Sequence, residues 1–466
     1  MNSLKRFDML TYQKRRQKLS EQFQDGLVLL FGNGESSMNF SDNWYPFRQD
    51  STFLYYTGID TPDLVMLIDL DGEKEILFGD DVSMDQIIWT GPLPTVAERA
   101  KMAGIKHSSS TKDLKVFLQK AQDKSRNIRF LPPYREERIH KLHHLLDIPI
   151  SSINQKVAQD LIRAVIAQRS YKSNEEVNEM EKAINISNQM HLLAIQSAKA
   201  GMREYELVGK VKGKAIACGG DVAYPVILTI NGQTLHNHYY GNSLKDGNMV
   251  LMDAGAENTM HYAADLTRTF PVSNKFSSLQ KDMYNIVLDA YEHAVKSLIP
   301  GKPFRDIHLL AAEKLVSGLV ALGFMKGKSK EAVEAGAHTM FFQCGLGHMI
   351  GLDVHDMEDL GEEYVGYDES VKKSSVFGLK SLRLGKALEI GQTITVEPGI
   401  YIIPELIDRW QAEMKYIDFI NYEKLNSIRD FGGIRIEDNF LITKEGSRKL
   451  GDYLPLKAEE IEDLRS

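Results

Sequence analysis

GLGHMIGLDVHD, residues 345–356, is the stretch on which the interpretation of this chain depends, because it holds two histidines among closely spaced glycines. His348 and His355 are two helical turns apart in sequence, but the glycines disfavour a helix here. We therefore expect a glycine-rich loop that leads into a strand-like LDVHD and lets the backbone approach a site closely. A buried histidine is most often a packed core residue, so this stretch alone leaves a structural role and a ligand or catalytic role equally open.

Four carboxylates in the C-terminal half stand in comparably rigid surroundings. Asp253 ends the strand-like NMVLMD and Asp265 precedes the alternating segment LTRTF, so a hairpin would bring these two acids together. Glu397 interrupts the apolar stretch QTITVEPGIY, and Glu437 lies in GGIRIED. An acid at the end of an apolar strand must be paired, bind a metal ion or raise the free energy of the fold.

Each of these acids also has a simpler interpretation. Asp253 is suited to an Asx turn, which is common where a strand ends. Asp265 is suited to a solvent-facing strand position paired with Arg268. Glu437 is suited to a side-chain pair with Arg435, two residues earlier on the same strand face. None of the acids therefore indicates a function by itself.

The set as a whole carries too much negative charge to be left unbalanced. Four carboxylates that converge within about 4–5 Å repel by roughly 4 kcal/mol per close pair at an effective dielectric constant of about 20. Without counter-charge, some of them would take up protons or the site would open. Two divalent ions cancel four negative charges, so the sequence predicts a dinuclear metal site. Its predicted ligands are Asp253, Asp265, His348, Glu397 and Glu437.

The chemistry of the predicted ligands indicates which ions they would hold. Oxygen-rich ligation with a single imidazole favours Mn²⁺, with Co²⁺ and Zn²⁺ as alternatives, over the sites of structural zinc. Two ions about 3.5–4 Å apart can hold a hydroxide between them, because they lower the pKa of water from about 15.7 towards roughly 7. The predicted reaction is metal-assisted hydrolysis of a polarised carbonyl.

Bulk properties exclude several other classes of protein. The 466 residues carry a net charge of −8, which argues against a broad nucleic-acid surface. The basic run from Lys5 to Lys18, which includes Arg15 and Arg16, is interpreted as a solvated helix face. Two cysteines favour a reducing compartment over a disulfide scaffold. The apolar runs are too short for a membrane helix, so we expect a cytoplasmic protein with neither a membrane nor a nucleic-acid partner.

The order of elements predicts two domains. The first, residues 1–168, is expected to be a smaller α/β domain. Its expected elements are a helix over 8–24, a strand over 26–32, two strands around an Asp-Gly turn over 63–79, helices over 112–122 and 135–145, and a helical connector over 153–169. The second, residues 169–466, mixes helices and strands and is expected to be α+β. Its expected elements are helices over 173–201 and 278–298, with polar lid loops or insertions over 361–386 and 404–430.

Five motifs, in this order along the chain, carry a family resemblance: LMDAG, ADLTRTFPV, GLGHMIGLDVHD, TVEPGIY and GIRIED. They resemble the aminopeptidase P and prolidase group of pita-bread metallopeptidases. YPFRQDSTFLYYTG, residues 45–58, resembles the auxiliary domain that precedes the catalytic domain in that group. The resemblance covers nearly the whole chain and implies an α+β protein, with a pita-bread catalytic domain preceded by a smaller α/β domain.

The resemblance also implies roles for individual residues. Asp253 would be the terminal carboxylate of one metal ion, and Asp265 and Glu437 would bridge the two ions. His348 and Glu397 would be ligands of the other ion. Glu397 would also move the proton, and five further residues would act on the substrate or support the site. His355 would stabilise the tetrahedral intermediate, and His236 would contact the substrate. Arg383 would hold a substrate carboxylate. Arg435 would lie near the site, and Tyr401 would support or contact the site.

Two departures from the family pattern stand out. The interval from Asp253 to Asp265 is one residue longer than usual, which predicts a longer turn near residues 258–261. Cys344 occupies a position where many relatives have histidine, so no supporting histidine is expected there. His238 and His261 are interpreted as residues that do not bind metal.

The resemblance implies an Xaa-Pro aminopeptidase that acts on peptides with proline in the second position. A prolidase restricted to Xaa-Pro dipeptides is the alternative, and Arg383 in GLKSLR favours it. A metal-free creatinase-like hydrolase or peptide-binding protein is a more distant alternative, because such relatives are expected to have lost ligands. The resemblance further implies a homodimer or homotetramer, in which Trp44 and Trp89 would contribute to a neighbouring site.

Overall fold

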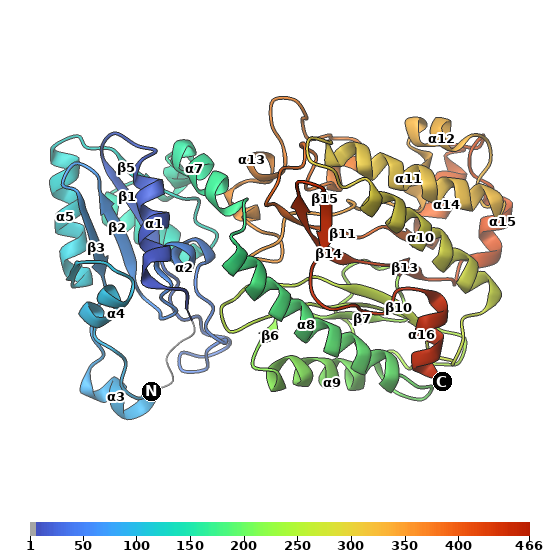
Figure 1. Cartoon of the computed structure of the whole chain (residues 1–466), viewed down its shortest axis with the longest axis horizontal. Helices are drawn as coiled ribbons and strands as arrows, with labels where there is room; N and C mark the ends of the chain where they lie inside the picture. Colours follow the sequence, from blue (N-terminus) through green and yellow to red (C-terminus); the bar gives the residue numbers. More distant parts are fainter. Residues whose placement is uncertain (1–5) are drawn as a thin grey trace. The chain divides into compact units, whose positions relative to one another are not determined.

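The computed structural model describes residues 6–466, so Lys5 of the basic run lies outside the described residues. The chain divides into two compact units, with the boundary between Arg169 and Ser170. Each unit has its own sheets and helices (Figure 1). Among residues 6–466, every helix is either too short or too polar to span a lipid bilayer.

The N-terminal unit is built on a mixed five-stranded sheet with the order β4-β3-β2-β1-β5. Its strands are β1 (Leu27–Phe31), β2 (Val65–Asp69), β3 (Lys74–Phe78), β4 (His107–Ser109) and β5 (Ile128–Phe130). The first three strands pair antiparallel, and β4 and β5 extend the sheet in parallel at its two edges. The expected pair of strands around an Asp-Gly turn is confirmed as β2 and β3.

This unit also contains helices, of which Met84–Thr90 buries none of its residues. They are α1 (Met9–Ser20), α2 (Ser51–Thr57), α3 (Met84–Thr90), α4 (Val96–Met102), α5 (Thr111–Asp123), α6 (Glu136–Leu146) and α7 (Gln159–Arg169), with a 3-10 turn η1 (Ile150–Gln155). Leu118 of α5 and Leu142 of α6 pack with Leu29 and Phe31 in one core cluster. Each such leucine contributes about 1.5–3 kcal/mol when fully buried, so this packing holds α5 and α6 on the sheet.

The interpretation of the basic run in α1 as a solvated face is wrong for two of its residues. Arg16 is 0% exposed and Arg15 is 8% exposed. The guanidinium of Arg16 donates to the carbonyls of Tyr56 and Ala103, at 2.8 and 2.9 Å. Arg16 Nε also pairs with Glu75 Oε1 at 3.0 Å, so the buried charge is balanced and hydrogen-bonded, whereas charge patterning alone favours exposure.

The C-terminal unit contains four short sheets in the described part of the chain. Its strands are β6 (Asp221–Val222), β7 (Ile227–Thr229), β8 (Met249–Asp253), β9 (Ala256–Glu257), β10 (Thr267–Pro271), β11 (Thr393–Val396), β12 (Gly399–Tyr401), β13 (Gly433–Arg435), β14 (Asp438–Thr443) and β15 (Gly446–Lys449). The sheet orders are β10-β8-β7, β11-β14-β15, β12-β13 and β6-β9. An isolated bridge between Thr267 and Glu437 joins the first of these sheets to the junction of β13 and β14.

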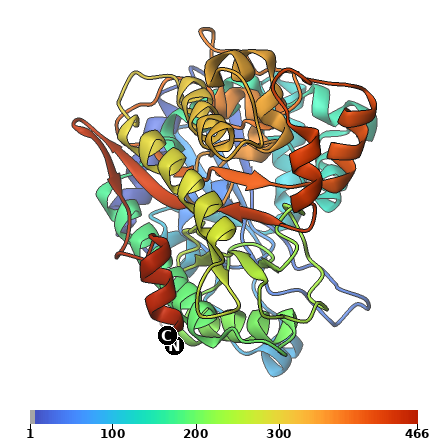
Figure 2. The same cartoon turned by 90° about the vertical axis from the view of Figure 1, so that its right-hand side faces the viewer.

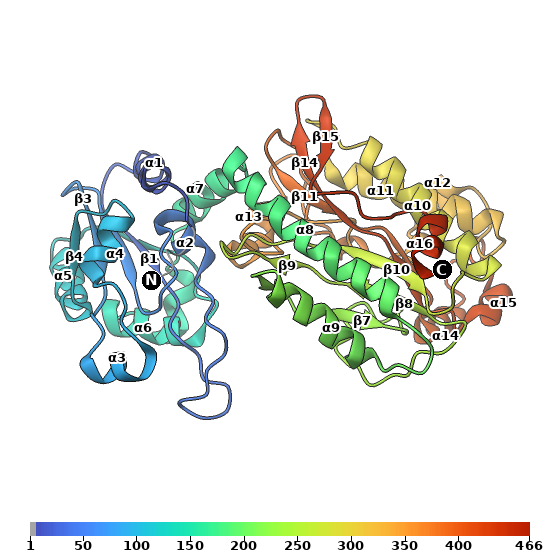
Figure 3. The same cartoon turned by 60° about the horizontal axis from the view of Figure 1, so that its bottom comes forward.

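Long helices surround these sheets. The helices are α8 (Asn174–Ser197), α9 (Glu204–Ala217), α10 (Ser278–Lys296), α11 (Phe304–Ala321), α12 (Ser329–Ala335), α13 (Glu362–Gly366), α14 (Pro404–Ala412), α15 (Tyr422–Leu425) and α16 (Ala458–Arg465), with 3-10 turns η2 (Ala337–Met340), η3 (Glu358–Leu360), η4 (Leu379–Ser381) and η5 (Asn426–Ile428). The helices α8 and α9 lie side by side next to β9 and β7 (Figure 3). The helix α10 packs against α11 and also contacts β11, β12 and β13; Figure 2 shows this unit from the side.

Most of the expected helices of this unit are confirmed, and two expectations are corrected. Ser173 and Glu176 form the capping box that starts α8. Residues 404–430 are not an irregular lid, because α14 forms there and buries Ile407 and Trp410. LDVHD is not a strand either, because hydrogen-bonded turns replace a ladder after Gly351.

Candidate metal centre

The strand pair β8–β10 brings two of the predicted ligands together. Asp253 ends β8 opposite Thr267, and Asp265 lies just before β10. The hydroxyl of Tyr224 hydrogen-bonds both carboxylates, at 2.6 Å from Asp253 Oδ1. A hydroxyl donates one proton, so the second carboxylate must itself be protonated or be balanced by a cation.

The antiparallel strand pairs β11–β14 and β12–β13 place Glu397 and Glu437 close to each other. Glu397 lies between β11 and β12, and Glu437 lies between β13 and β14. In the registers of these pairs, Val396 is opposite Asp438 and Gly399 is opposite Arg435. The two glutamates therefore face the same junction of strands, although they are distant in sequence.

The glycine-rich loop brings His348 to this junction. The His348 carbonyl accepts from the Thr395 backbone N–H at 3.0 Å, and the Leu346 carbonyl accepts from that of Glu397 at 2.7 Å. A Cβ at Gly347 would lie 2.1 Å from the Thr395 carbonyl oxygen, so only glycine permits this approach. The loop and β11 thus hold His348 and Glu397 as neighbours.

The orientation of the His348 ring suits a ligand. Nδ1 lies 3.0 Å from the Met349 carbonyl, which can only accept, so the proton is on Nδ1 and Nε2 keeps its lone pair. Nε2 lies 3.3 Å from Asp265 Oδ2 and 3.7 Å from Glu397 Oε1. A hydrogen bond from the ring nitrogen that does not bind metal commonly orients a histidine ligand.

Three of the side chains converge closely enough to share an ion. Asp265, His348 and Glu437 each offer a ligand atom, and these atoms lie within 4.8 Å of one another. Glu437 is 1% exposed. Its Oε2 accepts from Thr267 Oγ1 at 2.7 Å, while its buried Oε1 has no hydrogen-bond partner. A buried carboxylate oxygen without a partner is costly, so the residues present fit a divalent cation.

Arg435 and Arg268 do not form the simpler pairs considered for the acids. Arg435 Nη2 lies 2.6 Å from Asp253 Oδ2, and its Nη1 donates to the Tyr401 hydroxyl at 2.9 Å. Arg268 pairs with Asp438 at 3.0 Å rather than with Asp265. Tyr401 therefore reaches the site through Arg435.

Burial and mutual repulsion shift the pKa values of the site in the absence of metal. Burial raises the pKa of Asp253 and Asp265, and that of Glu437 well above its usual range. Burial also raises the pKa of Glu397 to about 8, with Arg435 opposing the shift. Burial lowers the pKa of His348 to about 4. Without metal, the site thus favours neutral carboxyl groups and a neutral imidazole.

These shifts predict how the stability of the metal-free protein depends on pH. A carboxyl group whose folded pKa is raised stabilises the fold at low pH, and this contribution is lost as the pH rises to about 8. His348 acts in the opposite direction only below about pH 6.5, where the unfolded chain binds its proton. We expect the melting temperature of chelator-treated protein to fall by at least about 3 °C between pH 6.5 and pH 8.5. Calorimetry with and without Mn²⁺ at both pH values tests this, and a flat or rising value in the metal-free protein would contradict it.

A cavity of about 480 Å³ opens at this centre. All five predicted ligands line it, as do four of the five other predicted site residues. Those four are His236, His355, Arg383 and Arg435. The volume is within the range of about 300–1,000 Å³ that small ligands occupy. His238 and Cys344 also line the cavity, whereas His261 pairs with Glu257 at 2.7 Å.

Cys344 adds no charge to the cavity wall. Burial raises the pKa of its thiol to about 12, so the group is neutral at physiological pH. Its Sγ lies 3.7 Å from the Tyr401 hydroxyl. The replacement of the expected histidine therefore leaves a small neutral group in contact with a residue that supports Arg435.

Two residues of the site were not predicted from the sequence. Tyr224 bridges the two aspartates but belongs to no motif that marks it. Glu358 lies 2.7 Å from His355 Nδ1 and 3.1 Å from Arg383 Nε. The sequence indicated Glu358 as a possible partner of His355 only through its position three residues later.

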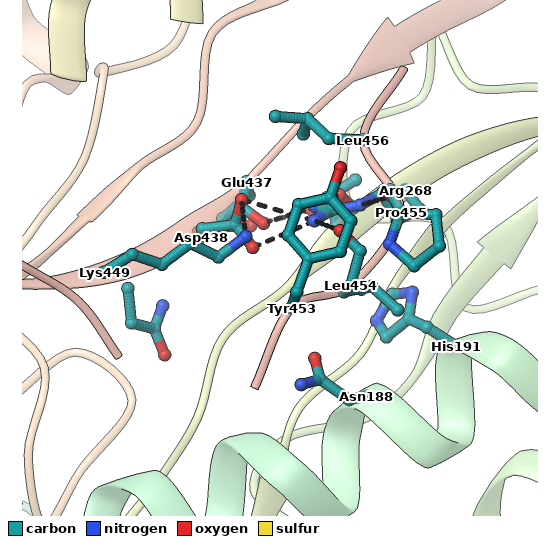
Figure 4. A network of polar contacts seen from close by, with 12 residues as sticks. Asn188, His191, Arg268, Glu437, Asp438, Lys449, Tyr453, Leu454, Pro455 and Leu456 are labelled. Carbon is teal, nitrogen blue, oxygen red and sulfur yellow. Dashed lines mark hydrogen bonds and ion pairs between the residues drawn. The ribbon is translucent and has the colours of Figure 1, made fainter. Parts of the chain in front are cut away.

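A buried ion pair supports the backbone on the far side of Glu437 (Figure 4). Arg268 is 0% exposed and donates to the Glu437 carbonyl at 2.9 Å and to the Pro455 carbonyl at 2.8 Å. Its partner Asp438 also pairs with Lys449 at 2.9 Å. This network fixes the chain next to a predicted ligand without reaching the cavity.

Comparisons with known proteins identify the family of the chain. Residues 178–444 match metallopeptidase family M24, and residues 12–129 match the aminopeptidase P N-terminal domain. The Xaa-Pro aminopeptidase of Escherichia coli K12 is 31% identical over 472 residues, which cover 97% of each chain. A probable Xaa-Pro aminopeptidase of Sordaria macrospora is 31% identical over 446 residues, which cover 94% of this chain and 91% of that protein.

Solved structures show the same fold. Zinc-substituted E. coli aminopeptidase P in complex with product superposes with a TM-score of 0.81 and 28% identity, over 99% of this chain and 98% of that chain. The same enzyme with the inhibitor Pro-Leu gives a TM-score of 0.81 and 29% identity, with the same coverage. The expected α+β pita-bread arrangement with a smaller N-terminal domain is confirmed. The chain therefore belongs to metallopeptidase family M24, and within it to the aminopeptidase P group.

Proposed function

We propose that this protein is an Xaa-Pro aminopeptidase, which hydrolyses the bond between an N-terminal residue and a following proline. Residues 169–466 would be the catalytic domain and residues 1–168 the auxiliary domain. The observation that carries the proposal is the unpartnered, buried Oε1 of Glu437 beside Asp265 and His348 at the cavity wall. A cation at this position would give the buried oxygen a partner, and a buried polar atom without a partner is costly.

The proposed ligand set holds two divalent ions, preferentially Mn²⁺, with Co²⁺ and Zn²⁺ as alternatives. Asp253 would hold one ion, His348 and Glu397 would hold the other, and Asp265 and Glu437 would contribute to both. When bound, such ions polarise a carbonyl and activate water. This chemistry suits a bond before proline, because that amide lacks the N–H that many proteases read.

The side chains around the ligands move the proton and bind the substrate. Glu397 lines the cavity, where its carboxylate would take a proton from the attacking water and return it to the leaving amine. His355 is held through Nδ1 by Glu358, which leaves Nε2 for the substrate. His236 lines the same cavity and would contact the substrate.

A second candidate is a prolidase restricted to Xaa-Pro dipeptides, and Arg383 favours it. Arg383 lines the cavity, and its Nε is held by Glu358. Its two terminal nitrogens have no hydrogen-bond partner among residues 6–466, so they suit a substrate carboxylate. A dipeptide places its carboxylate directly after the proline ring.

A substrate panel separates these functions. Purified protein is tested on an Xaa-Pro dipeptide, an Xaa-Pro-Xaa tripeptide and an Xaa-Pro pentapeptide, each with Mn²⁺, Co²⁺ or Zn²⁺ and after chelation. Release of the first residue from all three lengths supports the aminopeptidase, and cleavage of the dipeptide alone supports the prolidase. Elemental analysis before and after Mn²⁺ return tests the metal. Hydrolysis that survives complete chelation, or no hydrolysis with any ion, would overturn the proposal.

Replacing His355 with alanine is expected to lower turnover by about 10²-fold while metal content stays unchanged. The reason is that His355 stacks edge-on against His348, with ring centroids 4.4 Å apart, but offers no ligand atom to the convergent group. Steady-state kinetics and elemental analysis of the same preparation measure both quantities. A variant depleted of metal would show that His355 helps to hold the ions.

Assembly and location complete the proposal. We infer a homodimer or homotetramer, because Trp89 is 87% exposed and Trp44 is 45% exposed on the N-terminal unit. Aromatic residues are enriched at protein interfaces relative to the rest of the surface. The free cysteines Cys218 and Cys344 suit a reducing compartment, which supports a cytoplasmic location. Analytical ultracentrifugation would test the first point, and a monomer at micromolar concentration would contradict it.

A further inference from the structure

Glu358 connects two residues of the cavity wall that have different tasks in the proposed function. Its Oε2 lies 2.7 Å from His355 Nδ1, and its Oε1 accepts from Arg383 Nε at 3.1 Å. His355 and Arg383 both line the cavity, and they come from separate segments of the chain. One carboxylate thus fixes the imidazole and the guanidinium relative to each other.

The backbone around Glu358 is tightly held. Met357 is buried and adopts a left-handed conformation with φ of 65°, which L residues other than glycine rarely adopt. The Glu358 N–H then closes a turn to the His355 carbonyl at 3.2 Å. Asp356 is fixed by Lys172 at 2.9 Å, with the two side chains 1% and 2% exposed. Glu358 is therefore a positioned group rather than a mobile surface acid.

Glu358 brings a negative charge to Arg383. The hydrogen bond from His355 holds the pKa of Glu358 at about 2, and the charge of Arg383 acts in the same direction. At neutral pH the carboxylate is therefore ionised. A substrate carboxylate bound by the free terminal nitrogens of Arg383 would be attracted by the guanidinium and repelled by Glu358.

We propose that Glu358 is a specificity-determining residue, which orients His355 for hydrolysis and weakens the binding of free substrate carboxylates by Arg383. This inference rests on the proposed function. Its consequence is that dipeptides gain little from their carboxylate, so the site also accepts peptides that continue beyond proline. Repulsive elements of this kind commonly set specificity alongside attractive ones.

The proposal separates two kinetic effects. The orientation of His355 acts on every substrate, so its loss lowers kcat whether or not a carboxylate follows the proline. The repulsion acts only on substrates with a carboxylate at that position, so its loss lowers KM for a dipeptide and not for the dipeptide amide. A residue with a merely structural role would change both substrates alike.

The experiment compares Glu358→Gln, Glu358→Asp and Glu363→Gln in Mn²⁺-loaded protein. Glu363 is an exposed glutamate of α13 in the same loop region and serves as the matched control. The substrates are an Xaa-Pro dipeptide, its C-terminal amide and an Xaa-Pro-Xaa tripeptide. For Glu358→Gln, we expect kcat to fall about 10-fold on all three, because a misplaced catalytic group costs up to about 10²-fold. We expect KM of the dipeptide to fall about fivefold relative to the amide, because one like charge is removed.

The other variants complete the test. Glu358→Asp keeps the charge and should retain the wild-type ratio of dipeptide KM to amide KM, and Glu363→Gln should leave all parameters unchanged. An unchanged ratio in Glu358→Gln, with normal metal content and melting temperature, would overturn the inference while wild-type hydrolysis stands. Failure of the wild type to cleave any of the three substrates would instead overturn the proposed function.

Discussion

Glu397→Gln is expected to abolish hydrolysis, with a loss of more than about 10³-fold in kcat/KM. The amide has nearly the shape of the carboxyl group, but it cannot move a proton and it binds divalent ions weakly. The fold should survive, because the backbone N–H of Glu397 keeps its bond to Leu346. The metal-free variant should be at least as stable as the wild type at pH 8, because one repelling charge is gone from a buried cluster.

Three measurements on one preparation test this expectation. Kinetics on an Xaa-Pro-Xaa peptide give the loss of activity, elemental analysis gives the metal content, and calorimetry after chelation gives the stability. Glu405→Gln, an exposed glutamate at the start of α14, is the matched control and should behave as the wild type. Normal turnover in Glu397→Gln would remove Glu397 from both of its proposed roles.

Arg268→Met is expected to cause the largest loss of stability, about 3–5 kcal/mol in the free energy of unfolding of the C-terminal unit. The substitution keeps most of the side-chain volume but leaves Asp438 as a buried carboxylate with less counter-charge. It also removes the Arg268 donor from the Pro455 carbonyl and one of the donors from the Glu437 carbonyl. Each effect is costly because water cannot replace the lost partner.

Arg305→Met provides the contrast, because Arg305 forms a surface pair with Asp306 in which the two side chains are 44% and 46% exposed. We expect that change to cost no more than about 1 kcal/mol. Urea unfolding monitored by circular dichroism and by tryptophan fluorescence compares the two variants and can separate the two units if they unfold independently. Equal midpoints for both variants would show that the Arg268 network contributes nothing beyond a surface pair.

Short-range patterns predicted the parts of the site that depend on local structure. Asp253 at a strand end and Glu397 between two short strands both lie where the sequence placed them. The glycines around His348 correctly predicted a loop instead of a helix. In the structure, Gly347 lets this loop lie against β11. The five predicted ligands all reach the wall of one cavity. Their assignment as ligands remains the prediction that the experiments above test.

Long-range contacts could not be predicted in the same way. Arg435 and Asp253 are far apart in sequence, and only the meeting of β8 with β13 makes them partners. The bridging hydroxyl of Tyr224 likewise depends on how β7 and β8 pair. Residues 404–430 were misjudged because their many polar side chains obscure the two apolar positions, Ile407 and Trp410, that dock α14.

The Arg268 network also has a consequence for biosynthesis. The guanidinium that braces Glu437 is completed by the Leu454 and Pro455 carbonyls, and α16 follows directly after them. A nascent chain that has not yet emerged past residue 455 cannot finish this brace. We therefore expect a nascent chain to gain peptidase activity only after residue 455 has left the ribosome, so that shorter chains are inert towards neighbouring polypeptides.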